Sequence, residues 1–325
     1  MAKPMMRAGI ATEGGIALHD MPRPVPTETE ILVKVAAIGV DRADLASSKS
    51  QPGAAPTIPG LEWAGQVAQV GAKVTSFKPG DWVMCSGQGG GYAEYAVTDA
   101  GRAWTFDPKE IDVDQAAALP LALITCHDAL KTQGQLKPGG TVLVNGASSG
   151  VGLMMMQVAK VLGATLIAGT SRDPAKQKEL PKFGCTLVLD SSKPDWADQL
   201  LAATNGKGVD VVTDMVSGAT INDSMRATAI HGRIVNVGRL GGGTAPFNFD
   251  LHANRRITYT GVTFRTRSVD EVREIVVNMK ADLWTAVREK RLTLPVDRSF
   301  KLAQAAQAHA TMAANAQFGK IILVP

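Results

Sequence analysis

Residues 142–163 read VLVNGASSGVGLMMMQVAKVLG. The first apolar residues have the composition of a buried strand, the middle is a turn of small residues, and the rest has the length and pattern of a helix. A strand that passes through such a turn into a helix is the setting of the dinucleotide-binding fingerprint G-x-G-x-x-G. An ordinary glycine-rich turn is the alternative, which the flanking strand and helix disfavour. The stretch therefore predicts a nucleotide-binding α/β domain.

Three small residues, Ala147, Ser149 and Gly152, take the glycine positions of that fingerprint. Small side chains there allow the tight turn, the close approach of a pyrophosphate and the packing of the helix on the strand. The N-terminus of the helix offers free N–H groups and the positive end of its dipole to phosphates. The predicted phosphate-binding residues are Ala147, Ser148, Ser149, Gly150, Val151 and Gly152.

The choice of nicotinamide cofactor depends on residues 169–176, GTSRDPAK, at the end of the next strand. An Asp or Glu at this strand end would hold a ribose diol, whereas an arginine can pair bidentately with a 2′-phosphate. Asp173 stands before a proline and suits a helix N-cap better than a ribose contact. A solvated basic surface is the alternative. We expect NADPH, bound by Thr170, Ser171, Arg172 and Lys176.

Outward from this stretch, the chain has two kinds of pattern. After residue 141, short apolar runs alternate with helical segments, which predicts a doubly wound parallel sheet. Residues 30–97 read as strands broken by Gly and Pro, which predicts a β-rich domain. After residue 256 we expect one more strand, a long helix beginning near Ser268, and a closing helix and strand at 303–315 and 319–325.

Composition limits the classes of function. The 325 residues suffice for two domains, and 45% hydrophobic and 20% charged residues are ordinary for a globular protein. The net charge of +4 comes from residues spread along the chain, so we expect no specific nucleic-acid binding. Three widely spaced cysteines predict neither a disulfide framework nor a metal knuckle, and no segment suggests a signal peptide or a membrane span. We expect a cytoplasmic protein with a small-molecule substrate.

Six motifs follow one another in a family order: DRADL (41–45), GLEWAG (60–65), KPGDWV (78–83), GGYAEY (90–95), ASSGVG (147–152) and FGKIIL (318–323). With them, nearly the whole chain resembles the medium-chain dehydrogenase/reductase superfamily, and within it the zinc-free quinone oxidoreductase, or ζ-crystallin-like, branch. The resemblance implies a GroES-like β-rich substrate domain (1–122 and 263–325), a Rossmann NADPH-binding domain (123–262), an active site between them, and commonly a homodimer joined through the Rossmann sheets.

Zinc-dependent members of that superfamily carry a Cys, a His and a second Cys at positions that read Asp41, Leu61 and Leu121 here. A catalytic zinc needs three protein ligands, and even with Glu62 only two oxygens remain. We expect no metal.

The resemblance also maps the nicotinamide half of the site. By their positions in the sequence, a set of strand-end and loop residues should line this half of the site. Taken alone, each of them could equally be an ordinary strand-end or loop residue. They are Thr125, Val216 in the 214–218 turn, Val237, Gly238, Arg239, Phe264, Arg265, Thr266 and Asn315.

Without a metal to lower the pKa of an alcohol, reduction of a polarised acceptor is the favoured chemistry. We expect hydride transfer to a quinone or another conjugated carbonyl compound. A reductase of enones or enoyl thioesters is the alternative on the same scaffold, and a non-catalytic, crystallin-like NADPH-binding protein is the alternative of another class.

The sequence leaves several candidates for the proton donor. Relatives usually have Asn at the position of Asp41 and often a tyrosine soon after, but residues 42–63 contain no tyrosine. The candidates are water, Ser47, Ser48 and Asp41, with a solvated helix cap as the other interpretation of Asp41. We expect His127 to be a packed residue, Glu62 and Asp44 to hold the domain together, and Trp63 to narrow the pocket or fill the core.

Overall fold

The computed structural model describes residues 4–47 and 55–325, which divide between two compact units. Unit 1 comprises Met1–Leu121, Ser268–Val276 and Thr293–Pro325, and unit 2 comprises Ala122–Arg267 and Val277–Leu292. The long helix after residue 268 is thus shared between the units. The domain limits of 1–122 with 263–325, and of 123–262, remain a prediction.

Unit 2 is built on a six-stranded sheet in which every pairing is parallel. In order across the sheet, its strands are β10 (Leu187–Asp190), β9 (Leu166–Ser171), β8 (Thr141–Asn145), β11 (Val209–Asp214), β12 (Thr228–Asn236) and β13 (Thr258–Gly261). This is the 3-2-1-4-5-6 order of a Rossmann sheet. The predicted doubly wound fold is confirmed.

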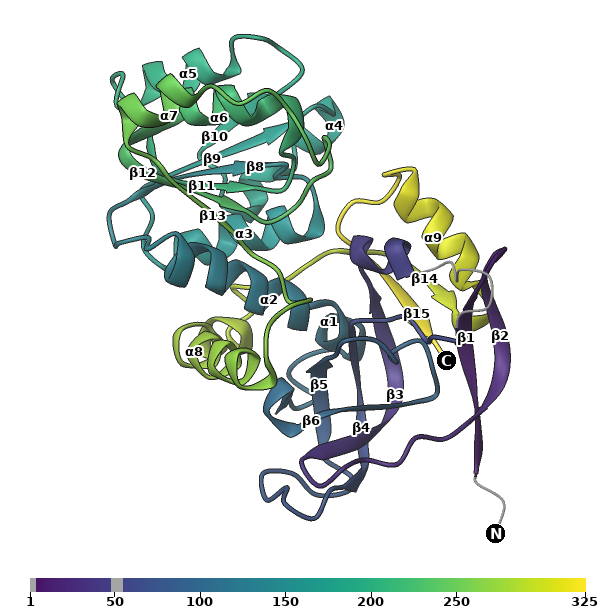
Figure 1. Cartoon of the computed structure of the whole chain (residues 1–325). Coiled ribbons are helices and arrows are strands. Elements are labelled where there is room, and N and C mark those ends of the chain that lie inside the picture. The colour runs from purple at the N-terminus through teal and green to yellow at the C-terminus, as the bar shows by residue number, and fades with distance from the viewer. Residues whose placement is uncertain (1–3, 48–54) are drawn as a thin grey trace. The chain divides into compact units, whose positions relative to one another are not determined.

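Helices cover both faces of this sheet (Figure 1). Figure 1 shows α3 on one face and α5, α6 and α7 on the other, so the apolar strands between them are buried on both sides. The helical segments of unit 2 are the end of α2 (Pro120–His127), a π-helical turn (Asp128–Gln133), α3 (Gly150–Val161), α4 (Pro174–Gln177), η4 (Leu180–Phe183), α5 (Trp196–Ala203), η5 (Gly218–Thr220), α6 (Ile221–Ala227) and α7 (Phe249–Arg255).

Unit 1 is a mostly antiparallel β structure, as a GroES-like domain requires. Its seven-stranded sheet runs β14 (Val296–Lys301), β15 (Lys320–Val324), β3 (Glu30–Val40), β4 (Glu62–Val70), β5 (Trp82–Ser86) and β7 (Ala103–Thr105), with β6 (Tyr95–Asp99) also paired to β3. The residues at the end of β3 pair with β15, so that Val40 lies opposite Ile321, far away in the sequence.

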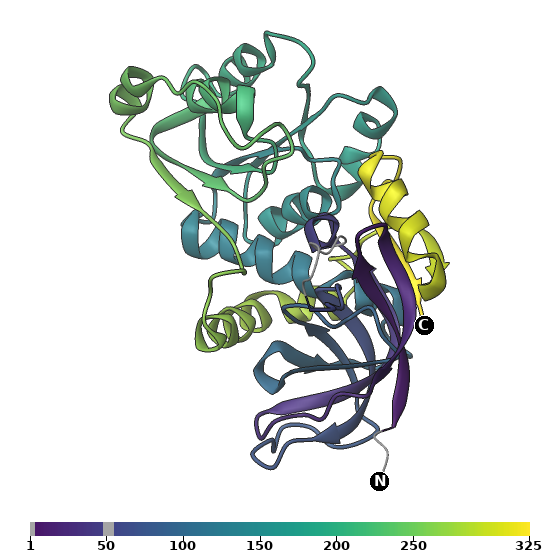
Figure 2. The same ribbon diagram turned by 45° about the vertical axis from the view of Figure 1, so that its right-hand side comes forward.

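A hairpin and short helices complete unit 1. The hairpin joins β1 (Met5–Thr12) and β2 (Gly15–Pro22), and α9 (Ala305–Ala313) lies beside it in both views of the chain (Figures 1 and 2). The other helical segments are α1 (Val113–Ala118), η1 (Arg42–Ser47), η2 (Ala100–Arg102) and η6 (Leu302–Gln304).

Trp63 lies on β4 in the core of unit 1, with its side chain fully buried. Its ring leaves no room for side chains on the facing loop, since a Cβ at Gly87 or Gly91 would lie 2.5 or 2.7 Å from the indole. Of the two roles considered for Trp63, the structure therefore supports the filling of the core.

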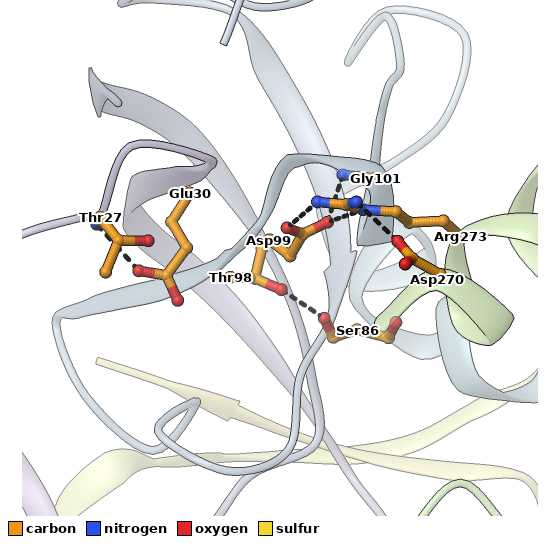
Figure 3. Close-up of polar contacts among 8 residues, drawn as sticks. All are labelled: Thr27, Glu30, Ser86, Thr98, Asp99, Gly101, Asp270 and Arg273. Carbon is orange, nitrogen blue, oxygen red and sulfur yellow. Dashed lines mark hydrogen bonds and ion pairs between the residues drawn. The ribbon is translucent and has the colours of Figure 1, made fainter. Parts of the chain in front are cut away.

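The shared helix α8 (Val269–Arg288) begins where the sequence predicts, because Ser268 and Glu271 form a capping box at its start. In unit 1, Arg273 on this helix donates two hydrogen bonds, of 2.9 and 2.6 Å, to the carboxylate of Asp99 at the end of β6 (Figure 3). These bonds lower the pKa of Asp99 against the effect of burial. The first turns of α8 are thereby fixed to unit 1.

In unit 2, the same helix contributes Asp282, whose carboxylate lies 2.7 Å from Nε2 of the buried His127. The prediction that His127 is a packed, hydrogen-bonded residue is confirmed. None of the helices within residues 4–47 and 55–325 is long and apolar enough to cross a membrane.

Candidate active site

The turn between β8 and α3, residues 146–152, is held by neutral hydrogen bonds. Gly146 N–H donates to the Thr170 hydroxyl at 2.9 Å, and Ala147 N–H donates to the Thr170 carbonyl. The Ser149 hydroxyl donates to Gly146 O at 2.9 Å and accepts from Gly152 N–H at 3.1 Å, so it caps α3. The turn is therefore formed by the chain itself before any ligand arrives.

Close packing at this turn explains two of its small residues. A Cβ at Gly152 would lie 2.5 Å from Gly146 O, so only glycine lets α3 approach the strand this closely. The backbone of Gly146 has a φ of +87°, the left-handed conformation that a tight turn needs. The fingerprint alignment assigned the tight turn to Ala147, whereas the structure has it one residue earlier, at Gly146. The N–H groups at the start of α3 and the positive end of its dipole suit a pyrophosphate.

The residues predicted to hold the 2′-phosphate lie next to this turn, at the end of β9. Thr170 is fully buried, and its hydroxyl donates to Asn145 Oδ1 at 2.7 Å while it accepts from Gly146 N–H. Thr170 therefore holds the turn in place and is not free to bind a phosphate through its hydroxyl hydrogen. The hydroxyls of Ser171 and Ser148 lie 3.1 Å apart. Asp173 accepts from the N–H groups of Ala175 and Lys176 and caps α4, as predicted.

Arg172 is exposed at the same strand end, and within the described parts of the chain no group pairs with its guanidinium. Lys176 lies on α4, one helical turn further on. An exposed guanidinium beside the 146–152 turn is the donor set that suits a phosphate ester on the ribose.

At the ends of β11 and β8, a buried hydrogen-bond network that the sequence did not reveal fixes the backbone at the predicted Val216. Asp214 is fully buried, and its Oδ1 accepts from Val216 N, Ser217 N and the Asn145 side chain at 2.9, 2.9 and 3.0 Å. Burial raises the pKa of Asp214 above its usual value, and the hydrogen bonds from Ser217 and Val216 offset only part of this effect. Ser217 has φ +57° and ψ −149°, a conformation that normally requires glycine.

The structure thus brings most of the predicted cofactor residues of unit 2 to one edge of its sheet. The 146–152 turn, the β9 end, Val216 and the 237–239 loop all follow the carboxyl ends of neighbouring parallel strands. Ligands of such sheets bind at this edge, where the strand order reverses. Thr125 is buried on α2, and Phe264, Arg265 and Thr266 follow β13. Their cofactor contacts remain predictions.

In unit 1, Asp41 is paired with a lysine from the end of the sequence. Lys320 on β15 lies 2.8 Å from Asp41 Oδ1 and 2.5 Å from Glu62 Oε1, and the three side chains are 6%, 12% and 0% exposed in that order. Burial alone would lower the pKa of Lys320, but the carboxylates of Asp41 and Glu62 raise it overall. The interpretation of Asp41 as a solvated helix cap is therefore wrong, because its carboxylate is paired inside the protein.

Three further buried residues extend this pairing. Asp44 Oδ2 accepts from Asp41 N at 2.8 Å and from the Tyr92 hydroxyl at 3.1 Å, and that hydroxyl lies 2.9 Å from His309 Nε2. The Tyr92 hydroxyl has one hydrogen and donates it in the hydrogen bond to Asp44, so it accepts from His309, whose Nε2 carries the hydrogen. We call Asp41, Asp44, Glu62, Tyr92, His309 and Lys320 the Lys320 cluster.

The pKa values in the Lys320 cluster reflect burial. Burial, followed by the charge of Asp41, raises the pKa of Asp44 to about 7 and that of Glu62 to about 8. Burial lowers the pKa of His309 to about 4 and raises that of Tyr92 well above its usual value. The expectation that Asp44 and Glu62 hold the domain together agrees with their contacts.

Comparison with known proteins places the chain in a family. Residues 27–108 match the model of the alcohol dehydrogenase GroES-like domain, and residues 150–281 match that of the zinc-binding dehydrogenase. The quinone oxidoreductase of Pseudomonas aeruginosa is 32% identical over 330 residues, with 100% of both chains covered. The chain belongs to the quinone oxidoreductase branch of the medium-chain dehydrogenase/reductase superfamily.

Solved structures of similar proteins include cofactor complexes. The structure of mycobacterial Rv1454c complexed with NADPH is 30% identical and has a TM-score of 0.88, covering 98% of this chain and 100% of that one. The Escherichia coli quinone oxidoreductase complexed with NADPH is 26% identical, with a TM-score of 0.87 and 99% of both chains covered.

The zinc positions of the superfamily have other uses in this quinone oxidoreductase family member. The Leu121 N–H donates to Glu62 Oε2 at 2.7 Å, and Lys320 places an ammonium between Asp41 and Glu62. The two oxygens that could help to hold a metal are therefore already paired with one ammonium of the chain itself. The expectation of a metal-free site remains a prediction that this pairing supports.

Other predicted residues of unit 1 lie around Asp41. Asn315 accepts a hydrogen bond from Arg42, which also donates to Met312 O at 2.8 Å. The Ser47 hydroxyl donates to Asp44 O at 3.1 Å, whereas Ser48 lies outside the described residues. Lys320, Tyr92 and His309 were missed by sequence reasoning. A lysine in the apolar run KIILV was the one signal that could have pointed to them.

Proposed function

We propose that this nicotinamide-dependent oxidoreductase uses NADPH to reduce a quinone or another conjugated carbonyl compound without a metal. The observation that carries the cofactor assignment is the exposed Arg172 at the end of β9, where an acidic residue would favour NADH. The NADPH complexes of the two structural relatives support it. The relatives named quinone oxidoreductase support the class of acceptor.

The residues of unit 2 would hold the cofactor in parts. The 146–152 turn would bind the pyrophosphate, and Ser171, Arg172 and Lys176 would bind the 2′-phosphate. Val216 and the 237–239 loop would lie along the nicotinamide half, together with Thr125, the 264–266 loop and Asn315. When bound, NADPH supplies the hydride, and the chain's own residues orient the acceptor and stabilise the charge that grows on its oxygen.

The cofactor assignment is tested with Arg172→Ala combined with Lys176→Ala. The wild type should bind NADPH more tightly than NADH, because charge-assisted hydrogen bonds contribute roughly 1.5–3 kcal/mol each. The double variant should lose that preference and keep its NADH affinity, whereas Lys178→Ala, an exposed lysine on the same segment, should change neither. Equal affinities for both cofactors in the wild type, measured by fluorescence titration, would overturn the assignment.

The acceptor is tested by following NADPH oxidation with quinones, enones and enoyl thioesters. Quinone reduction supports the proposal, and turnover confined to enones or enoyl thioesters identifies the alternative reductase. Background rates with every acceptor indicate a non-catalytic NADPH-binding protein.

A cytoplasmic homodimer completes the proposal. Its support is β13, an end strand of the six-stranded sheet, together with three exposed apolar residues of unit 2: Tyr259 on β13 (42% exposed), Phe249 on α7 (76%) and Ile230 on β12 (56%). An exposed strand edge with apolar neighbours suits pairing with a second copy.

A further inference from the structure

Ser217 combines a strained backbone with a buried hydroxyl in the turn after β11. Its φ of +57° and ψ of −149° lie in a region that glycine adopts freely and that a residue with a Cβ adopts only under strain. Such strain persists only where the surroundings fix it, and it is concentrated at functional sites. A glycine would give the same backbone without strain, so what the serine adds is its hydroxyl.

The hydroxyl of Ser217 joins two loops. It donates to Gly238 O at 2.8 Å and accepts from the side-chain amide of Asn236, and both partners lie at or just after the end of β12. Ser217 is 7% exposed, so water competes little for these hydrogen bonds. The hydroxyl therefore ties residues 214–218 to residues 236–241, and we call these two segments the paired loops.

Backbone contacts continue the link between the paired loops. Gly241 N–H donates to Val216 O at 2.7 Å. The loops also pack so closely that a Cβ at Gly218 would collide with Gly241 O. The two segments thus form one packed layer beyond the ends of β11 and β12.

The other polar groups of Ser217 are used as well. Its N–H donates to Asp214 Oδ1 at 2.9 Å, and its carbonyl accepts from the Thr220 hydroxyl at 3.0 Å. All of these partners belong to unit 2. The strained conformation is therefore held by the chain itself and is present before any cofactor binds.

We propose that Ser217 is a positioning residue for the nicotinamide half of NADPH, because its hydroxyl fixes the paired loops against each other. The inference rests on the proposed function, which assigns Val216 and the 237–239 loop to that half of the cofactor. Loops that are already ordered lose less conformational entropy when the ligand binds, so they bind it more tightly. A fixed wall also holds the nicotinamide ring in one orientation for hydride transfer.

The other half of the cofactor provides an internal comparison. The 2′-phosphate is assigned to the end of β9, and none of the hydrogen bonds of Ser217 involves a residue of that strand end. Loss of the Ser217 hydroxyl should therefore weaken the binding of the nicotinamide half and spare the adenosine half.

The test compares Ser217→Gly with Ser217→Ala in the full chain. Both changes remove the hydroxyl, but only glycine also relieves the backbone strain. Two ligands are titrated by calorimetry: NADPH, and adenosine 2′,5′-bisphosphate, which carries the 2′-phosphate but no nicotinamide. The matched control is Asn205→Gly, because Asn205 also has a positive φ, of +51°, but lies before β11, at the opposite edge of the sheet.

We expect both Ser217 variants to lose about tenfold in affinity for NADPH, and to bind the bisphosphate within about twofold of the wild type. Their kcat with 1,4-benzoquinone at saturating NADPH should also fall, because the ring is held less firmly. Ser217→Gly should unfold at a higher urea concentration than Ser217→Ala, so the loss of NADPH affinity would not follow stability. Asn205→Gly should keep both affinities.

Wild-type affinity for NADPH in Ser217→Gly would show that the paired loops do not need the hydroxyl, which overturns the inference and leaves the proposed function standing. An equal loss for both ligands would mean that Ser217 only stabilises the domain, and this also overturns the inference. A wild type that binds neither ligand overturns the proposed function, and the inference with it. If Ser217→Ala does not fold, the two affinities of Ser217→Gly, which relieves the strain, decide alone.

Discussion

The 146–152 turn of unit 2 and the Lys320 cluster of unit 1 both bury polar groups, but they satisfy them differently. The turn uses backbone N–H groups and the hydroxyls of Ser149 and Thr170, none of which carries a charge. The cluster uses three carboxyls and one ammonium. Neutral partners make the turn indifferent to pH near neutrality, whereas the cluster titrates in that range and depends on a single cation.

Removal of that cation should have the largest effect. Lys320→Met leaves Asp41 and Glu62 buried without a counter-charge, and loss of one partner from a buried pair costs roughly 3–5 kcal/mol. We expect the free energy of unfolding in urea to fall by that amount near pH 8, and by less near pH 5, where the carboxyls can take up protons.

The matched control is Lys73→Met, because Lys73 and Glu28 form an ion pair at 2.6 Å with both side chains about two-thirds exposed. Its loss should cost less than about 1 kcal/mol. Similar losses for the two variants would remove the contrast between buried and exposed pairing.

Titration of the cluster should be visible in wild-type stability. Asp44 and Glu62 have folded pKa values of about 7 and 8, above those of the unfolded chain. Between about pH 4 and 8 the folded protein therefore binds more protons than the unfolded chain. The contribution of Asp44 and Glu62 to the free energy of unfolding is fully present at the acid end of this range and is lost as the pH rises. Each proton contributes a slope of up to about 1.4 kcal/mol per pH unit.

Asp44→Asn removes one of these protons, so its stability should fall less steeply from pH 5 to 7 than that of the wild type. Urea unfolding at several pH values measures the difference between the two slopes. Parallel curves would assign the titration to residues outside the cluster.

The turn should instead respond to shape. Gly152→Ala forces a Cβ to within 2.5 Å of Gly146 O, and overpacking of this kind costs roughly 1–3 kcal/mol. We expect weaker NADPH binding by about tenfold or more, with no change in the pH dependence of stability. Gly243→Ala is the control, since nothing lies within 4 Å of its added Cβ. Unaltered affinity in Gly152→Ala, measured by fluorescence titration, would show that the turn adapts.

The two regions also differ in how far they could be predicted from the sequence. The residues of the turn are contiguous, and local strand, turn and helix signals fix them. Lys320 reaches Asp41 only through the pairing of β15 with the end of β3, where Ile321 lies opposite Val40. No local pattern encodes that register, and the burial of Asp41 and Asp44 depends on it. The buried pair of Asn145 with Asp214 was missed for the same reason, because it joins two strand ends 69 residues apart.

The pairing of β15 with β3 also affects the order in which the chain can fold during synthesis. All of unit 2 is made before β14 and β15 emerge, so its parallel sheet can form while unit 1 still lacks two strands. During that interval the end of β3 is an open edge, and Asp41 and Glu62 have no ammonium beside them. The arrival of β15 covers the edge and brings the Lys320 ammonium to both acids in a single event, so unit 1 is completed after unit 2.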